Sequence, residues 1–302
     1  MKRLTLLILA LAATLVSAFA EPESAKARYT HTYDFQDFTT LAVSHAFKVE
    51  LTFENRFAVR IDVPDFLEPY LLVGQRDEKL LIELKQLPDD IQRKLNDRDN
   101  PMRAYVSAPK LNTLQLNGAS VVSVTGQLTL GEETLRIQLN GATQLNGLKA
   151  KGKEHMLLQL NGASKADMEV EFDKLIFDMS GAAKLRCEGE AKQISIVCSG
   201  ASTAQVEGDF EDVIADISGS SKLSLSGDSE RLSLEQSGAT KFESTGKTTR
   251  GIVELSGASK GRLTVTEQLR YSLSGVATLW VEDLGANIKG DCSRGSKIEF
   301  LK

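Results

Sequence analysis

The sequence predicts an all-β fold, a single-stranded parallel β-helix (β-solenoid) with about ten regular rungs of ~19 residues. Three observations carry this prediction. A short Asn/Ser-Gly-Ala-Ser motif recurs, apolar and polar residues alternate between its copies, and the run after a copy usually closes on another glycine. The intervals between copies settle at 19 residues, which is typical of stacked repeats that contact only their neighbours. A tenth, degenerate copy begins at Ser293. The nine clear copies have their glycines at Gly118, Gly141, Gly162, Gly181, Gly200, Gly219, Gly238, Gly257 and Gly275.

The stretches between the motifs alternate like strands with one buried face. Residues 135–139 (LRIQL) and 194–198 (ISIVC) have a period of two, which is the period of a strand and not of a helix. A second, shorter run after each motif gives every rung two main strands. Parallel crossovers are generally right-handed, so we expect a right-handed coil. The positions two residues before the glycine form an interior column with one polar exception: Leu116, Leu139, Leu160, Met179, Cys198, Ile217, Gln236, Leu255, Leu273 and Cys292.

Residues 1–20 have the features of a secretory signal peptide. Lys2 and Arg3 precede a short apolar run that ends in the small-x-small sequence Ala18-Phe19-Ala20. The run is too short for a membrane-spanning helix. We therefore expect an exported protein with no transmembrane segment after cleavage, located in the periplasm, at the outer-membrane surface or outside the cell.

The rest of the chain divides into two parts. Residues 21–110 lack the clear motif but contain strand-like stretches, and we expect irregular rungs or a β-cap there, with a charged loop at 86–103 and a short helix at 90–95. Residues 111–302 hold the regular repeats. Residues 96–100 (NDRDN) resemble a calcium loop only faintly, because they lack its central glycine and terminal glutamate, so a solvated loop is favoured.

Charge and cysteine content exclude several functions. The net charge is −5 and there is no basic block, so nucleic acid is not an expected partner. Cys187, Cys198 and Cys292 show no CxxC spacing, and we expect free thiols, no metal site and no cofactor.

The residue before each glycine predicts a hydrogen-bonded ladder along the rod, because identical polar groups would lie above one another on successive rungs. A residue type repeated on every rung favours a structural role over a catalytic one. The ladder consists of Asn117, Asn140, Asn161, Ser180, Ser199, Ser218, Ser237, Ser256 and Ser274.

A column of lysines three residues after the glycine is the candidate binding surface, for an acidic polysaccharide or lipid head group. Its default interpretation is a solvated face that keeps the rod soluble. Trp280, the only tryptophan, falls on an outward position and is a further candidate because its ring can stack on a sugar; packing against the last rungs or a partner is the alternative. The lysines are Lys165, Lys184, Lys222, Lys241, Lys260 and Lys297.

Two other outward columns are notable. Polar and acidic residues lie three positions before the glycine, and an aliphatic column, interrupted by Ser195 and Ser233, lies five positions before it. The aliphatic column indicates a covered or partner-binding surface, or else a partly buried third side of the coil. Its members are Leu157, Ile176, Ile214 and Ile252, and the acidic residues are Asp178, Asp216, Glu235, Glu254 and Asp291.

The pattern resembles the bacterial family called putative auto-transporter adhesin, head GIN domain. The resemblance is carried by the signal peptide, the short strands of residues 38–84, and the sequence from Ala108-Pro109 into Leu116-Asn117-Gly118-Ala119, and it extends through the Ser-Gly-Ala-Ser rungs. It implies a β-solenoid with a role in adhesion or polysaccharide contact at the cell envelope. It implies no catalytic residues.

Three functions are compatible with these features. We favour a non-catalytic binding or adhesin-like module, whose partner is a polysaccharide or another envelope protein. A structural protein that assembles through its open last rung is the first alternative, and the oligomeric state is left open. A polysaccharide-degrading enzyme is the second; it would need a carboxylate pair at a set separation, and the acidic residues are instead spread along the rungs.

Overall fold

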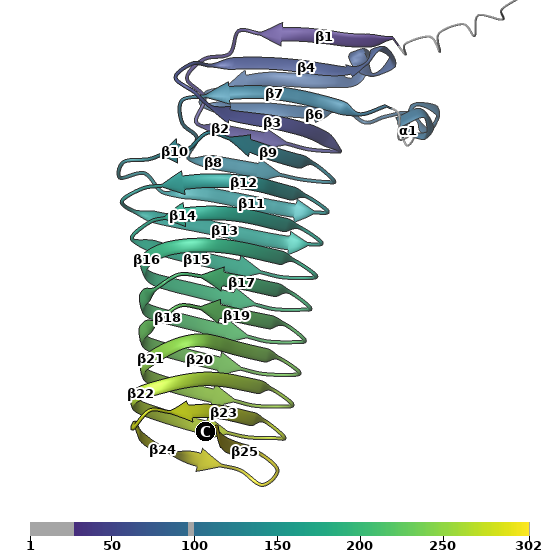
Figure 1. Ribbon diagram of the computed structural model, residues 1–302. Coiled ribbons are helices and arrows are strands. Elements are labelled where there is room, and N and C mark those ends of the chain that lie inside the picture. The colour runs from purple at the N-terminus through teal and green to yellow at the C-terminus, as the bar shows by residue number, and fades with distance from the viewer. Residues whose placement is uncertain (1–26, 96–99, 302) are drawn as a thin grey trace, which may run out of the picture.

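Each repeat forms one rung of a coil in which two parallel sheets enclose the core (Figure 1). The computed structural model describes residues 27–95 and 100–301. The predicted signal peptide and residues 96–99 of the charged loop lie outside the described residues. The predicted β-solenoid of about ten turns and ~19-residue rungs is confirmed, and the handedness of the coil stays a prediction.

The strands that precede the motif glycine form one sheet, which we call the pre-motif sheet. It begins with β6 (Lys79–Leu84) and β2 (Thr40–Val43) and continues through one strand of every rung. Its other strands are β8 (Thr113–Leu116), β11 (Leu135–Gly141), β13 (His155–Gly162), β15 (Lys174–Met179), the second half of β16 (Lys184–Cys198), β18 (Phe210–Ile217), β20 (Ser229–Gln236), the second halves of β21 (Lys241–Leu255) and β22 (Lys260–Leu273), and β24 (Asn287–Cys292).

The strands that follow the glycine form the post-motif sheet. The first halves of β16, β21 and β22 belong to it, because these long strands continue around the corner into the pre-motif sheet. The short β10 (Leu128–Thr129) pairs with the end of β12. The remaining strands are β7 (Met102–Ala108), β3 (Phe47–Phe53), β9 (Val121–Thr125), β12 (Gln144–Lys151), β14 (Lys165–Glu171), β17 (Thr203–Glu207), β19 (Lys222–Ser226), β23 (Thr278–Asp283) and β25 (Lys297–Leu301).

Equivalent positions of successive rungs pair in register, so the columns of the sequence become columns in space. Leu160 pairs with Met179, and Met179 with Cys198, and all three side chains are fully buried. Each buried aliphatic side chain contributes about 2 kcal/mol, and only the neighbouring rungs can bury it. The stability of the rod therefore depends on the stacking of rungs.

The motif forms a tight corner between the two sheets. Gly219 has a φ of +73°, and a Cβ atom there would lie 2.6 Å from the carbonyl oxygen of Gly200 on the preceding rung. The amide of Ala239 in turn donates to the carbonyl of Gly219 at 2.8 Å. Glycine is needed because the corners stack backbone against backbone.

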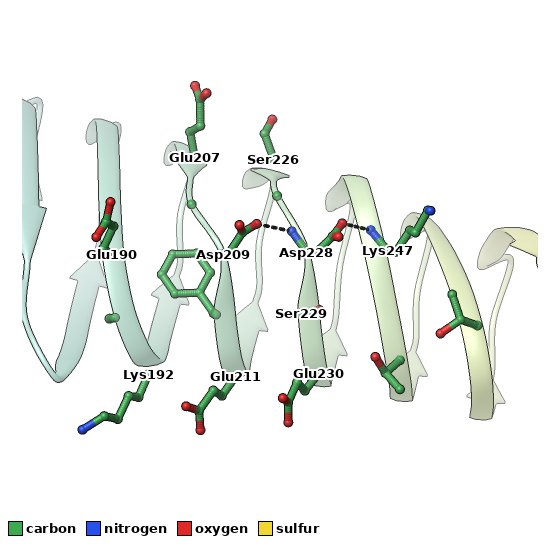
Figure 2. Close-up of a pocket in the computed structure, with 16 residues that line it drawn as sticks. Glu190, Lys192, Glu207, Asp209, Glu211, Ser226, Asp228, Ser229, Glu230 and Lys247 are labelled. Atoms are coloured by element: carbon green, nitrogen blue, oxygen red, sulfur yellow. Dashed lines mark hydrogen bonds between the residues drawn. The ribbon is translucent and has the colours of Figure 1, made fainter.

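A second corner leads from the post-motif sheet into the next rung. Figure 2 shows that the Asp209 carboxylate accepts a hydrogen bond from the amide of Asp228, and that Asp228 accepts one from the amide of Lys247, both at 2.7 Å. These aspartates link three successive rungs and satisfy backbone donors that the turn leaves free.

A further rung precedes the nine clear copies. The sequence Ser44-His45-Ala46 occupies the position of the motif, and His45 adopts a φ of +71° in the glycine slot. Its carbonyl accepts the amide of Ala119 at 2.6 Å, as the motif glycines do further along the rod. Strands β2 and β3 thus form an additional rung, which lies above that of β8 and β9.

Antiparallel strands cover the N-terminal end of the rod. Strand β1 (Arg28–Tyr33) pairs with β4 (Ala58–Pro64), β4 pairs with β7, and β5 (Leu71–Arg76) forms a hairpin with β6. The 3-10 helix η1 (Asp65–Tyr70) follows β4, and α1 (Asp89–Leu95) lies beside the rod. The cap ends the parallel stacking, as terminal units of repeat proteins do.

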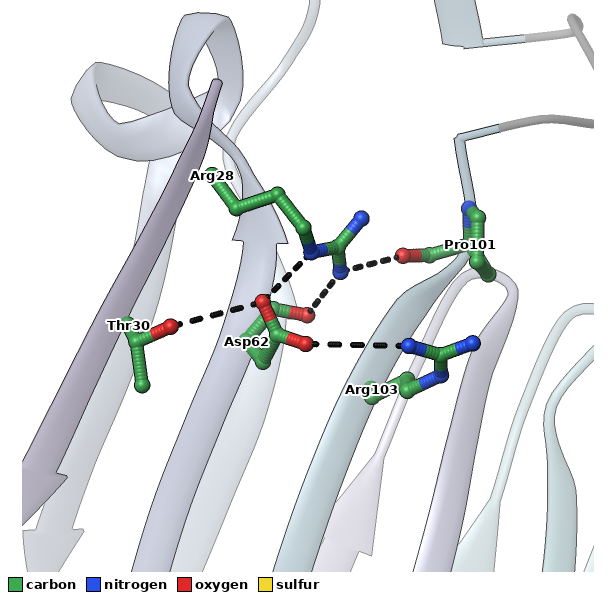
Figure 3. A network of polar contacts seen from close by, with 5 residues as sticks. All are labelled: Arg28, Thr30, Asp62, Pro101 and Arg103. Carbon is green, nitrogen blue, oxygen red and sulfur yellow. Dashed lines mark hydrogen bonds and ion pairs between the residues drawn. The ribbon is translucent and has the colours of Figure 1, made fainter. Parts of the chain in front are cut away.

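A polar network joins the three antiparallel strands of the cap (Figure 3). The Arg28 guanidinium donates to the Asp62 carboxylate at 2.6 Å and to the carbonyl of Pro101 at 2.9 Å. Arg103 lies 3.8 Å from the other carboxylate oxygen of Asp62. One carboxylate therefore connects β1, β4 and the start of β7.

Candidate binding surface

The predicted lysines form one column on the outer face of the post-motif sheet. Lys165 pairs with Lys184, Lys222 with Lys241, and Lys241 with Lys260. Thr203 and Thr278 interrupt the column, and Lys297 continues it. All six lysines are exposed except Lys222, which is half-buried. The structure thus brings them together as one stripe along the rod.

Some lysines of the stripe have their charge neutralised by a glutamate two residues further along the same strand, in the neighbouring outward column. Lys241 forms an ion pair with Glu243 at 2.9 Å, and Lys297 forms one with Glu299. Hydrogen bonding from Lys241 lowers the pKa of Glu243, and the charges of Lys222 and Arg262 lower it further. In the part of the chain that the structure describes, Lys260 and Arg262 have no carboxylate within 4.0 Å.

Three side chains converge at the C-terminal end of the stripe. Arg262 pairs in register with Trp280, and Lys260 lies two residues before Arg262 on the same strand. They line a hollow of about 480 Å³, together with Lys241, Phe242, Glu243 and Leu301. Two of the predicted lysines and the predicted tryptophan therefore share one site, and Arg262 is the residue that the sequence analysis missed. Trp280 and Arg262 are both five residues after their motif glycines, so the same column arithmetic could have found it.

The tryptophan ring is held in place from the next rung. Its Nε1–H donates to the Glu299 carboxylate at 2.7 Å, and the residue is half-buried. Hydrogen bonds from Lys297 and from Trp280 lower the pKa of Glu299, so this acceptor stays ionised. An indole ring that is held by a hydrogen bond and lines a basic hollow suits stacking on a sugar beside an anionic group.

The ladder before the glycine has two different parts. Asn140 donates to Asn117 at 3.0 Å, Asn161 to Asn140 at 2.8 Å, and Ser180 to Asn161 at 2.7 Å. The later serines differ from the expectation, because Ser199 donates to the carbonyl of Met179 and Ser256 to that of Gln236, both at 3.1 Å. An Asn amide carries both a donor and an acceptor and bonds to the side chains of both neighbouring rungs, whereas these serine hydroxyls donate to the backbone of the preceding rung. Ser218, Ser237 and Ser274 occupy the same column.

A second polar column lies inside the coil and was missed by the sequence analysis. The fourth motif residue points inward, and its hydroxyl is buried on most rungs. Ser202 donates to Ser221 at 3.2 Å, and Ser221 also lies 2.8 Å from the carbonyl of Ser218. Its sequence signal was the Ser or Thr that ends almost every motif copy. The column comprises Ser120, Thr143, Ser164, Ser202, Ser221, Thr240 and Ser259.

Acidic side chains surround the second corner (Figure 2). A hollow of about 1000 Å³ lies there, and Lys192 and Lys247 are the lysines among its lining residues. Two of its carboxylates, on Asp209 and Asp228, already accept backbone amides. Within residues 27–95 and 100–301, no group of three or more metal-ligating side chains could hold a metal ion. The acidic residues of the hollow are Glu190, Glu207, Asp209, Glu211, Asp228 and Glu230.

The cysteines are free thiols, and two of them are buried. Burial raises the pKa of Cys187 to about 12 and that of Cys198 to about 11. Cys292 was predicted to belong to the interior column, but it is exposed, because its strand β24 pairs in the described part of the chain with β22 alone. Since the thiolate is the reactive form, Cys187 and Cys198 act as small core residues.

Comparison with known families identifies the repeat. A family model described as putative auto-transporter adhesin, head GIN domain matches residues 37–208 and 190–282. The chain belongs to this family. The matched ranges include the rung of β2 and β3 and the Trp280 position, so the GIN-domain pattern covers the cap apart from β1 and the regular rungs as far as β23. A search of curated proteins gives no match.

Several solved structures are similar to this GIN-domain chain. A putative adhesin from Parabacteroides merdae has 14% identity over 91% of this chain and 96% of its own, with a TM-score of 0.48. A putative adhesin from Parabacteroides distasonis has 15% identity over 91% and 97%, also with a TM-score of 0.48. In the described ranges, the structure contains no helix with the length and apolar character needed to cross a membrane.

Proposed function

We propose that this GIN-domain protein is an exported, non-catalytic binding module that holds an anionic polysaccharide at the cell envelope. The observation that carries the proposal is the convergence of Lys260, Arg262 and Trp280 in one hollow. We call these three residues the basic-aromatic site.

The chemistry of the basic-aromatic site suits a sugar that carries a carboxylate or sulfate. The ring of Trp280 offers an apolar face, and guanidinium groups bind carboxylates through two parallel hydrogen bonds. Lys260 and Arg262 are without carboxylate partners in the described residues, so their charges are available to a ligand. The stripe lysines on more distant rungs, such as Lys165 and Lys184, would add only a screened, long-range attraction.

A binding role without catalysis is supported by how the carboxylates are used. Asp209 and Asp228 hold turns, and Glu243 and Glu299 hold basic or indole groups. Family membership supports a location at the cell surface, and the predicted signal peptide supports export.

The proposal is tested by calorimetric titration of the exported chain, residues 21–302, with oligogalacturonate and with a neutral glucan of equal length. We expect binding of the anionic oligosaccharide alone, and an affinity about tenfold lower in Lys260→Glu/Arg262→Glu. The matched control is Lys165→Glu/Lys184→Glu, which makes the same charge change on the same sheet and should change the affinity by about twofold or less. An equal loss in both variants would indicate diffuse attraction to the stripe, and no binding at all would reject the glycan.

Assembly through the last rung is the second candidate function. Phe300 continues the inward column of Val281, yet it is 56% exposed. If the rod assembles there, the mass measured by sedimentation should rise with protein concentration and fall back in Phe300→Ser. A monomeric mass at every concentration would leave only the binding role.

A further inference from the structure

An exposed aliphatic column runs along the outer face of the pre-motif sheet. Residues of successive rungs pair in register as Ile176, Ser195, Ile214, Ser233 and Ile252. Large and small side chains therefore alternate along five rungs. Ile214 is 44% exposed and Ile252 is 53% exposed. The isoleucines form ridges about 10 Å apart, because each step between strands is about 4.8 Å.

The notch between two of these ridges is a groove. Ser233 lies between Ile214 and Ile252, and a hollow of about 470 Å³ includes all three. Arg231 and Arg250 lie on one flank of this hollow, and Arg270, which pairs in register with Ile252, ends the aliphatic column. Strongly exposed isoleucines in a repeated pattern indicate a surface that another molecule covers. The groove is wide enough for an apolar side chain to enter between the ridges.

The charged side chains on one flank of the aliphatic column form ion pairs within the chain, whereas those on the other flank do not. On the one flank, Arg231 forms an ion pair with Asp212, and Arg250 lies 3.8 Å from Glu267. The other flank is acidic, with Asp216, Glu235 and Glu254 stacked on three successive rungs. In the described part of the chain, none of these three carboxylates has a basic group within 4.0 Å.

Like charges that stand directly across neighbouring strands destabilise a sheet. The three stacked carboxylates are therefore arranged for a cationic group that arrives from outside the chain. Because these carboxylates lie beside the aliphatic column, the partner must also carry an apolar side chain within a few ångströms of its cationic group.

We propose that this face binds a basic amphipathic segment of a partner protein. Its apolar side chains pack between Ile214 and Ile252, and its Lys or Arg side chains pair with Asp216, Glu235 and Glu254. We call this surface the isoleucine-acid face. It lies on the pre-motif sheet, whereas the basic-aromatic site lies on the post-motif sheet, so the two sites are independent.

The test uses two fluorescein-labelled model peptides, one composed of leucine and lysine and the other of leucine and glutamate, with fluorescence anisotropy as readout. The leucine-lysine peptide should bind, and the leucine-glutamate peptide should not. Ile214→Ser/Ile252→Ser extends the serines of the column and should lower the affinity about tenfold. Glu235→Gln/Glu254→Gln should lower it severalfold and weaken its dependence on salt.

The matched control removes two charges from another acidic column. Glu188 and Glu207 are exposed and paired in register on the post-motif sheet, and Glu188→Gln/Glu207→Gln should leave the affinity within about twofold. Equal losses in the control and in Glu235→Gln/Glu254→Gln, or no loss in the isoleucine variant, would overturn the proposal. Sedimentation that shows a dimer lost in Ile214→Ser/Ile252→Ser would assign the face to a second copy instead, and would overturn it too.

Discussion

Replacing the one buried polar residue of the interior column should stabilise the rod. Gln236 is 1% exposed and lies between Ile217 and Leu255 in the register of the pre-motif sheet. Its amide nitrogen donates to the hydroxyl of Thr240 at 3.0 Å, while its Oε1 has no partner among the described residues. We predict that Gln236→Leu/Thr240→Val raises the free energy of unfolding.

The magnitude follows from the unsatisfied oxygen. A buried acceptor without a hydrogen bond costs about 1–3 kcal/mol, and replacing both partners of a hydrogen bond by apolar groups of similar shape is close to neutral. The double variant should therefore gain about 1–2 kcal/mol. Thr240→Val alone should lose about 1–2 kcal/mol, because the Gln236 amide nitrogen then has no acceptor either.

The assay is urea unfolding followed by circular dichroism, with the midpoints compared at equal slope. Gln205→Leu is the control, because Gln205 is exposed, and it should shift the free energy by about 0.5 kcal/mol or less. A double variant that is less stable than the natural chain would refute the reasoning, since Gln236 would then make an interaction that the geometry does not show.

Three further predictions concern the corner, the ladder and the thiols. Gly219→Ala should cost at least about 2 kcal/mol in urea unfolding, because its φ is +73° and a Cβ would meet the Gly200 carbonyl, whereas Ser220→Ala should be nearly neutral. Asn140→Ala should cost about 1–2 kcal/mol, since it leaves the side-chain oxygen of Asn117 without its donor and the amide nitrogen of Asn161 without its acceptor; a loss no larger than that of Ser199→Ala would contradict the ladder. At pH 8 a disulfide thiol reagent should label Cys292 alone, because burial raises the pKa of Cys187 to about 12 and of Cys198 to about 11, and labelling of either buried thiol in the folded protein would contradict their core positions.

The architecture of the regular rungs could be predicted because a stacked repeat fixes its own register. Once the motif glycines are aligned, every other position falls into a column. The lysine stripe is found in the structure where the alignment puts it, and so is the interior column from Leu116 to Leu273, whereas its last member, Cys292, is exposed. The same alignment of the rungs places Trp280 on the outer side of the coil. Few folds let long-range neighbours be read so directly from one sequence.

The remaining features depend on information that the motif does not contain. Irregular rungs or a β-cap were expected in residues 21–110, but the corner at Ser44-His45-Ala46 was not located, because a histidine with positive φ replaces the motif glycine. The antiparallel cap has no repeat, so its pairing depends on tertiary contacts such as those of Asp62. The ladder changes character after Ser180, because the hydroxyl of Ser199 donates to the backbone carbonyl of Met179 on the preceding rung and not to a side chain of the column.

The emission of Trp280 tests the central claim, that an anionic glycan is held in the basic-aromatic site. Because Trp280 is the only tryptophan of the chain, any change in emission arises at this ring. We predict a saturable change on titration with oligogalacturonate and none with a neutral glucan, and a midpoint about tenfold higher in Lys260→Glu/Arg262→Glu. Calorimetric binding of oligogalacturonate with an unchanged Trp280 emission would contradict the claim, because the ligand would then be bound elsewhere on the rod.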